Sequence, residues 1–90
     1  MEKKKLGNSG IEVSALCFGS DLLGSKHNRE TTFAVLDSFR EHGGTFLDTG
    51  NLYAAWLPGC SGGESESVIG EWLTDRNCRD EMVIGTKLGF

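Results

Sequence analysis

Hydrophobic and polar residues follow two different patterns in the first 20 positions of the chain. Residues 3–6 and 11–14 are short segments on either side of Gly7-Asn8-Ser9-Gly10, and apolar positions alternate with polar ones in the second segment. A glycine-rich turn between two such segments predicts a β-hairpin. The next run, 15–19, is apolar on both faces, which is the pattern of a strand buried on both sides.

Helical spacing appears first in residues 29–42. Its apolar face is predicted to contain Phe33, Val35, Leu36 and Phe39. Asn28 and Thr31 are alternative N-caps for this helix, because their short polar side chains can accept hydrogen bonds from the first turn. Gly43 stands where a glycine commonly ends a helix, so the sequence predicts both boundaries.

A second helix is predicted over residues 64–76. Its apolar stripe consists of Val68, Ile69, Trp72 and Leu73. Glu64 and Glu66 fall in the first turn, where the helix dipole favours negative charge. The stripe predicts that this helix buries one side only.

Residues 45–49 and 81–86 are short apolar segments that follow the two helices, and both predict strands. The predicted order is therefore a hairpin followed by strand, helix, strand, helix and strand. This alternation is typical of an α/β fold with a parallel sheet and right-handed crossovers. The doubly wound sheet and the (β/α)8 barrel both contain it, and three strands complete neither. We expect residues 1–90 to be one unit, with the character of a piece of a larger architecture.

Composition narrows the classes of function. The chain has 90 residues, of which 38% are hydrophobic, and 13 acidic residues against nine basic ones give a net charge of −4. This hydrophobic content is typical of a globular domain. The acidic balance argues against nucleic acid or an anionic membrane as the partner. No apolar run is long enough for a transmembrane helix, and no apolar region follows the lysines at positions 3–5 as it would in a signal peptide.

The cysteines predict a reducing compartment. Cys17, Cys60 and Cys78 are odd in number and widely spaced, without a C-x-x-C motif or a zinc-type Cys/His spacing. We therefore expect three unpaired thiols, no metal site and a cytoplasmic location.

One segment resembles a phosphate-binding loop without matching it. Gly19-Ser20-Asp21-Leu22-Leu23-Gly24-Ser25-Lys26 follows a predicted strand. In such loops the lysine directly follows the second glycine and the hydroxyl residue comes next, whereas here Ser25 precedes Lys26. The inverted order argues against this loop. An independent nucleotide-binding unit is kept as an alternative that ATP binding would test.

Asp48 and Lys87 form the more informative pair. Each lies at the C-terminal end of a predicted strand, and the two strands are consecutive. In a parallel sheet both ends open on the face that carries the active site of α/β enzymes. Tyr53 begins the loop on that face, where the charge of Lys87 would favour its phenolate form and suit it to donate a proton near neutral pH. The structural alternative is an Asp48 that caps the loop, a solvated Lys87 and a packed Tyr53.

Five stretches of the sequence follow one another in a characteristic order: residues 6–14 (LGNSGIEVS), 16–20 (LCFGS), 48–53 (DTGNLY), 64–73 (ESESVIGEWL) and 86–89 (TKLG). Residues 48–53 have the pattern D-T-[small]-x-x-Y, and residues 86–89 have the pattern T-K-x-G. Together these stretches resemble the aldo-keto reductase family. Residues 6–14 and 16–20 look like the family's N-terminal hairpin and first barrel strand, and residues 64–73 look like its second barrel helix.

The resemblance implies that residues 1–90 are the first third of a (β/α)8 TIM barrel, a partial domain that stops before the fourth strand. It also implies reduction of aldehydes or ketones with NADPH or NADH. Tyr53 would protonate the developing alkoxide, Lys87 would tune it, and Asp48 would hold Lys87. The cofactor's nicotinamide end would lie near Gly19, Ser20 and Asp48.

The same resemblance places several parts of the enzyme outside this sequence. The family's catalytic histidine follows the next strand, beyond Phe90, and so does most of the cofactor site. Trp56, in a long loop after Tyr53, is expected to line the pocket for a small-molecule carbonyl substrate, with sugar-like compounds as one class. Packing within the loop is the alternative role of Trp56. We expect residues 1–90 alone to be inactive. The alternative to an enzyme is a non-catalytic remnant or a self-associating interaction module.

Overall fold

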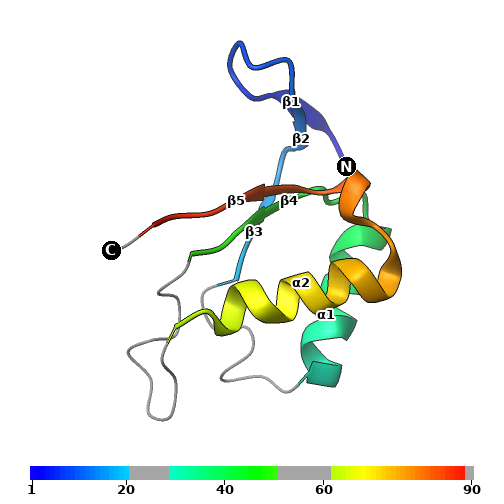
Figure 1. The fold of residues 1–90 in the computed structure, drawn as a ribbon. Coiled ribbons are helices and arrows are strands. Elements are labelled where there is room, and N and C mark those ends of the chain that lie inside the picture. Colours follow the sequence, from blue (N-terminus) through cyan, green and yellow to red (C-terminus); the bar gives the residue numbers. More distant parts are fainter. Residues whose placement is uncertain (21–28, 51–61, 89–90) are drawn as a thin grey trace.

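The computed structural model describes residues 1–20, 29–50 and 62–88 of the chain (Figure 1). It contains two separate sheets. The first is an antiparallel pair of β1 (Lys3–Lys5) and β2 (Glu12–Ser14). The second is a parallel sheet in the order β3-β4-β5, from β3 (Cys17–Gly19), β4 (Phe46–Asp48) and β5 (Val83–Gly85).

The hairpin and the strand–helix alternation are both confirmed. Lys4 lies opposite Val13 in the hairpin, and the N–H of Leu6 donates a 2.8 Å hydrogen bond to the carbonyl of Ile11 across the turn. In the parallel sheet, Leu47 lies opposite Phe18 on one side and Ile84 on the other. Figure 1 shows the hairpin standing apart from the helices, at one end of the molecule.

Helices α1 (Arg29–Glu41) and α2 (Glu64–Arg76) connect the parallel strands, and a short 3-10 turn, η1 (Arg79–Glu81), precedes β5. Both α-helices pack on the same side of the sheet (Figure 1). The core between helices and sheet contains Phe33, Leu36, Leu47, Val68, Ile69, Trp72, Leu73, Cys78 and Met82. The predicted stripe of α2 is therefore buried in full.

The predicted apolar face of α1 is wrong at one position. Val35 is 39% exposed, whereas Phe33 and Leu36 are buried. Two residues along a helix turn by about 200°, so Val35 cannot share the face of Phe33. Thr31 is not the N-cap either, because α1 begins at Arg29 and Thr31 lies inside its first turn. Asn28 lies outside the described residues.

Both helices end in the same way. Gly43 has a φ of 87°, and its N–H donates a hydrogen bond to the carbonyl of Arg40. The N–H of Gly44 donates a hydrogen bond to the carbonyl of Phe39. This pair of hydrogen bonds is a Schellman motif, and it confirms the predicted glycine stop. In α2 the left-handed position is taken by Asn77, with a φ of 51°. Asparagine tolerates this conformation better than most residues do.

The predicted strand over 15–19 is shorter than expected and is not buried on both sides. Leu16 is 64% exposed, Cys17 is also exposed, and Phe18 is half-buried. Side chains alternate between the faces of a strand. Phe18 therefore faces the helices with Leu47, and Cys17 faces the opposite side, over which no described helix lies. The predicted strand 81–86 likewise begins only at Val83, because Glu81 belongs to η1.

None of the helices in the described ranges is long and apolar enough to cross a membrane.

Candidate functional site at the carboxyl ends of the parallel strands

Asp48 and Lys87 form an ion pair at the C-terminal edge of the parallel sheet. The Lys87 Nζ lies 2.7 Å from Asp48 Oδ1 and donates a second hydrogen bond, of 2.9 Å, to the carbonyl of Thr49. The two charged side chains are 41% and 47% exposed, so the pair opens to solvent. The structure thus brings together two of the three residues for which the sequence predicts catalysis.

The strand register explains this approach. Asp48 lies opposite Gly19 in β3 and opposite Gly85 in β5. Two further backbone hydrogen bonds continue the ladder past the strand ends, from Ser20 N–H to the Asp48 carbonyl at 3.1 Å and from Thr49 N–H to the Gly85 carbonyl at 2.8 Å. Because all three strands run in the same direction, these termini share one edge of the sheet.

Gly19 and Ser20, predicted to lie near a cofactor, lie beside Asp48 but differ in exposure. Gly19 is exposed, and a Cβ added there would meet no atom of the described residues within 4 Å. The backbone at Gly19 is therefore open to close approach by another group. Ser20 is fully buried, and its hydroxyl donates a 2.6 Å hydrogen bond to the Asp48 carbonyl.

A buried hydroxyl cluster lies directly beneath the ion pair. Ser65 Oγ lies 2.9 Å from Ser20 Oγ and 2.7 Å from Thr49 Oγ1, and it donates a 2.6 Å bond to the Ser20 carbonyl. All three hydroxyl residues are no more than 1% exposed. The sequence interpretation did not include Ser65 or Thr49 in the site. A hydroxyl residue in the first turn of the helix that follows the active-site loop is the signal that could have indicated Ser65.

Cys17 lies in β3, the strand that ends next to Asp48. Partial burial, and then the negative charge of Asp48, raise the pKa of the Cys17 thiol, while Lys87 acts in the opposite direction. The thiol is thus held in its protonated form and is a poor nucleophile near neutral pH.

Several predicted features lie outside the described residues. These are Tyr53, Trp56, Cys60 and the segment 21–28, which includes Lys26. Among the residues that the structure does describe, no group of three His, Cys, Asp or Glu side chains could hold a metal ion.

The parallel sheet with a carboxylate–ammonium pair at its carboxyl edge defines an α/β protein with the site layout of barrel enzymes. Residues 15–90 match the family model of the Aldo/keto reductase family. The chain therefore belongs to the aldo/keto reductase family.

Curated relatives of different lengths are similar to this chain. An uncharacterized 11.2 kDa protein in the crtE 3' region of Pseudescherichia vulneris is 34% identical over 90 residues, which cover 99% of this chain and 87% of that protein. Norsolorinic acid reductase stcV of Emericella nidulans is 43% identical over 86 residues, which are 88% of this chain but 20% of that protein. Putative aryl-alcohol dehydrogenase AAD6 of Saccharomyces cerevisiae is 41% identical over 88 residues, or 89% of this chain and 38% of that protein.

Two solved structures share the fold. The holo form of aldo-keto reductase AKR11C1 from Bacillus halodurans superposes with a TM-score of 0.79 at 32% identity, over 99% of this chain and 26% of that one. The thermostable aldo-keto reductase Tm1743, in complex with the inhibitor epalrestat, gives a TM-score of 0.76 at 28% identity, over 98% and 31%. The fold is thus a partial (β/α)8 barrel, and the chain spans about a third or less of these structures.

Proposed function

We propose that residues 1–90 supply the aspartate, tyrosine and lysine of an NAD(P)H-dependent oxidoreductase that reduces a small aldehyde or ketone. The 2.7 Å contact between Lys87 and Asp48 carries this proposal. Ion pairs at strand ends also occur without catalysis. Membership of a reductase family and the position at the carboxyl edge favour the functional interpretation over a structural one.

Each residue would have a separate role. The nicotinamide cofactor would supply the hydride when bound, and the exposed backbone at Gly19 leaves room for a flat ring near Asp48. Asp48 accepts a hydrogen bond from Lys87 and so fixes the ammonium group at the sheet edge. The positive charge of Lys87 would favour the phenolate form of Tyr53, so that Tyr53 can lose its proton to the carbonyl oxygen during reduction.

Two classes of carbonyl substrate are proposed for this site. Some relatives are named norsolorinic acid reductase and aryl-alcohol dehydrogenase. Aromatic carbonyl compounds therefore join sugar-like compounds as candidates for this site, with Trp56 as a residue of the pocket. We propose a cytoplasmic location, in keeping with the unpaired thiols expected from the sequence.

A second candidate function is a self-associating, non-catalytic module. The sheet face opposite the helices carries a row of Cys17, Phe46 and Val83 in register, and no described helix covers it. A relative of 11.2 kDa is covered to 87% by this chain, which supports a role for a short protein of this sequence type. An apolar sheet face of this kind favours association with a second chain.

The test uses the protein purified from its source, with its intact mass measured first. A mass well above the 9.8 kDa of this chain would place these residues inside a longer reductase. NADPH and NADH oxidation is then followed with benzaldehydes, aromatic ketones and aldoses. We expect Asp48→Asn, Lys87→Met and Tyr53→Phe each to lower kcat by at least about 100-fold.

Lys4→Met is the matched control for the lysine change. Lys4 lies on β1, its side chain is 62% exposed and, within the described residues, it forms an ion pair only with Glu2, so its loss should leave kcat unchanged. Residues 1–90 expressed alone should show no turnover, because catalysis needs the hydride donor held close to the carbonyl. Turnover that survives Lys87→Met would exclude the proposed role of the pair.

A further inference from the structure

We propose that Ser65 and Glu66, adjacent residues in the first turn of α2, position the Asp48–Lys87 pair by hydrogen-bonding to the carboxyl ends of all three parallel strands. Their hydrogen bonds within the described residues go to Ser20, Thr49 and Thr86, which adjoin the pair, so they are positioning residues. The catalytic meaning of this positioning rests on the proposed function, whereas its structural part can be measured without a substrate.

Ser65 connects α2 to the ends of β3 and β4. Its hydroxyl donates to the carbonyl of Ser20, which follows β3, and lies 2.7 Å from Thr49 Oγ1, which follows β4. Ser65 is 0% exposed. A buried hydroxyl without partners costs free energy, so its several partners indicate a site selected for hydrogen bonding and not merely for small size.

The bonds of this cluster continue directly into the ion pair. Ser20 Oγ donates to the Asp48 carbonyl at 2.6 Å, and the Thr49 carbonyl accepts the second hydrogen bond of Lys87. Through Ser20 and Thr49, Ser65 therefore holds the backbone at residues 48 and 49. A shift of Ser65 would move both the carboxylate and one of the acceptors that hold the ammonium group.

Each hydroxyl proton of the cluster has an acceptor, so none is left over. The three hydroxyl protons are assigned to the Ser20 carbonyl, the Asp48 carbonyl and Ser65 Oγ. The 2.9 Å contact between Ser20 Oγ and Ser65 Oγ must then share one of these protons. Removing any one hydroxyl changes the bonds of the others, so the cluster is expected to behave as one cooperative unit.

Glu66 reaches the third strand. The hydroxyl of Thr86 donates a 2.6 Å hydrogen bond to Glu66 Oε2, and Thr86 is the residue immediately before Lys87. Successive helix positions differ by about 100°, which lets Ser65 point to β3 and β4 while Glu66 points to β5. One dipeptide of α2 thus sets the relative positions of Asp48 and Lys87, which come from different strands.

A double-mutant cycle tests this coupling. Unfolding constants are measured for wild type, Ser65→Ala, Lys87→Met and the double variant of the chain. Ser65→Ala changes the unfolding constant by some factor in wild type. We expect this factor to be smaller by about threefold or more in the Lys87→Met background, because the effects of contacting groups of one network are not additive. Ser67→Ala is the matched control, since Ser67 is exposed in the same helix and should be additive with Lys87→Met within about twofold.

Milder variants keep the test valid if Ser65→Ala does not fold. Thr49→Val removes the hydroxyl at nearly constant volume, and Thr49→Ser keeps it. Glu66→Ala and Glu66→Gln form the corresponding pair at the bond to Thr86. Among these four variants, only Thr49→Val and Glu66→Ala are expected to be non-additive with Lys87→Met. Additive effects for both of these would overturn the proposal, because they would show that the hydrogen bonds stabilise α2 without positioning the pair.

Kinetics on the protein from its source separate the two proposals. If it reduces carbonyls, Thr49→Val should lower kcat by about tenfold or more with KM for the substrate nearly unchanged, and Thr49→Ser should restore most of kcat. Coupling with no activity in wild type would refute the proposed function alone. Activity that is insensitive to Thr49→Val, together with additive unfolding constants, would refute the positioning role alone.

Discussion

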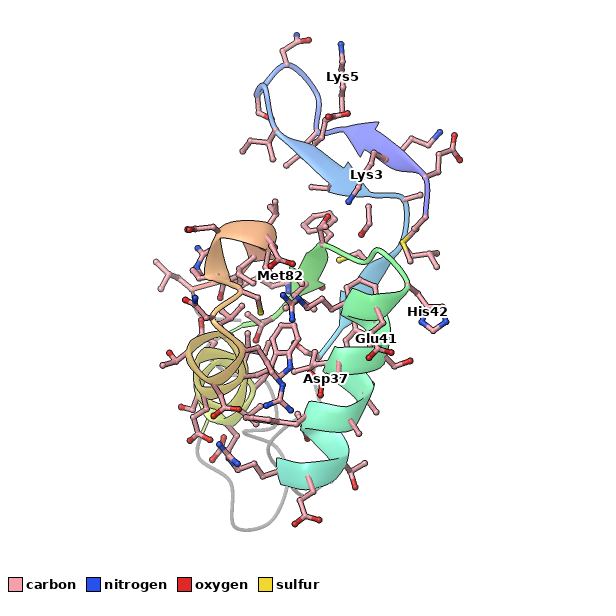
Figure 2. The ribbon with its side chains drawn as sticks, turned by 90° about the vertical axis from the view of Figure 1, so that its right-hand side faces the viewer. Lys3, Lys5, Asp37, Glu41, His42 and Met82 are labelled. Atoms are coloured by element: carbon pink, nitrogen blue, oxygen red, sulfur yellow. The ribbon has the colours of Figure 1, made fainter. Side chains whose placement is uncertain are left out.

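The indole N–H of Trp72 donates a 2.8 Å hydrogen bond to Asp37 Oδ1, which links the fully buried ring of α2 to a half-exposed carboxylate of α1. Arg76 adds two bonds of 2.9 Å to the same carboxylate, one to each oxygen. Its guanidinium also lies 5.2 Å from the centroid of the Phe33 ring. Figure 2 shows Asp37 on the side of α1 that faces α2. Asp37 therefore joins the two helices.

We expect the stability contributed by Asp37 to disappear in acid. The hydrogen bond from Arg76, and then that from Trp72, lower the pKa of Asp37 from 3.8 to about 2. A carboxylate with a depressed folded-state pKa stabilises the fold above its unfolded-state pKa and loses this effect as pH falls. The difference in free energy of unfolding between wild type and Asp37→Asn should thus be constant above about pH 5 and shrink from there towards pH 2.

Urea denaturation of wild type and Asp37→Asn across this pH range measures the difference in their free energies of unfolding. The other carboxylates titrate in both proteins, so their contributions to this difference cancel. At neutral pH we expect Asp37→Ala to cost about 1–2 kcal/mol, because both helices lose a charge-assisted contact that is only partly shielded from water. A difference that stays unchanged down to pH 2 would show that these contacts do not stabilise the charged carboxylate.

Two glycine-to-alanine changes should have opposite signs. A methyl group on Gly44 would overlap the ring of Phe39, which itself packs against Phe18 with 5.5 Å between ring centroids. Gly70 is exposed inside α2, and an added Cβ would meet no atom of the described residues within 4 Å. We expect Gly44→Ala to destabilise by about 1–3 kcal/mol and Gly70→Ala to stabilise by up to about 1 kcal/mol. Thermal unfolding of the two variants side by side checks both signs.

Local spacing was enough to predict the elements and their parallel order. The stripe from Val68 to Leu73 and the stop at Gly43 each depend on residues close in sequence, and both are confirmed. Burial of residues 15–19 depends on what covers the second face of the sheet. An apolar run cannot reveal this, and the described chain leaves that face without a helix.

The contacts of the candidate site likewise include some that the sequence predicts and some that it does not. The Asp48–Lys87 contact follows from two strand ends and a parallel register, so it could be predicted from sequence. The bond from Ser65 to Ser20 joins residues 45 positions apart and depends on how α2 lies against the sheet. Neither hydrophobic periodicity nor motif spacing contains that information.

Self-association should depend on the sheet face opposite the helices. If residues 1–90 associate through the row of Cys17, Phe46 and Val83, then Val83→Lys should weaken the association by about tenfold or more, because it places a charge in an apolar contact. Val35→Lys, on the outer side of α1, is the control and should have no effect. Sedimentation velocity over a range of concentrations measures both. A wild-type chain that remains monomeric throughout would remove this module hypothesis.

The exposed backbone at Gly19 allows a direct test of where the cofactor lies. Because an added Cβ would meet no atom of the described residues there and the residue is exposed, Gly19→Val should leave the unfolding midpoint nearly unchanged. The same side chain would occupy the space beside Asp48 in which we propose that the nicotinamide lies. We therefore expect the Kd for NADPH of the protein from its source to rise by about tenfold or more, equivalent to about 1.4 kcal/mol. Quenching of protein fluorescence by NADPH gives the Kd, and Gly70→Ala provides a glycine control away from the site. An unchanged Kd in a folded Gly19→Val variant would mean that the cofactor does not approach this strand end, and the assignment of Gly19 to its binding site would be wrong.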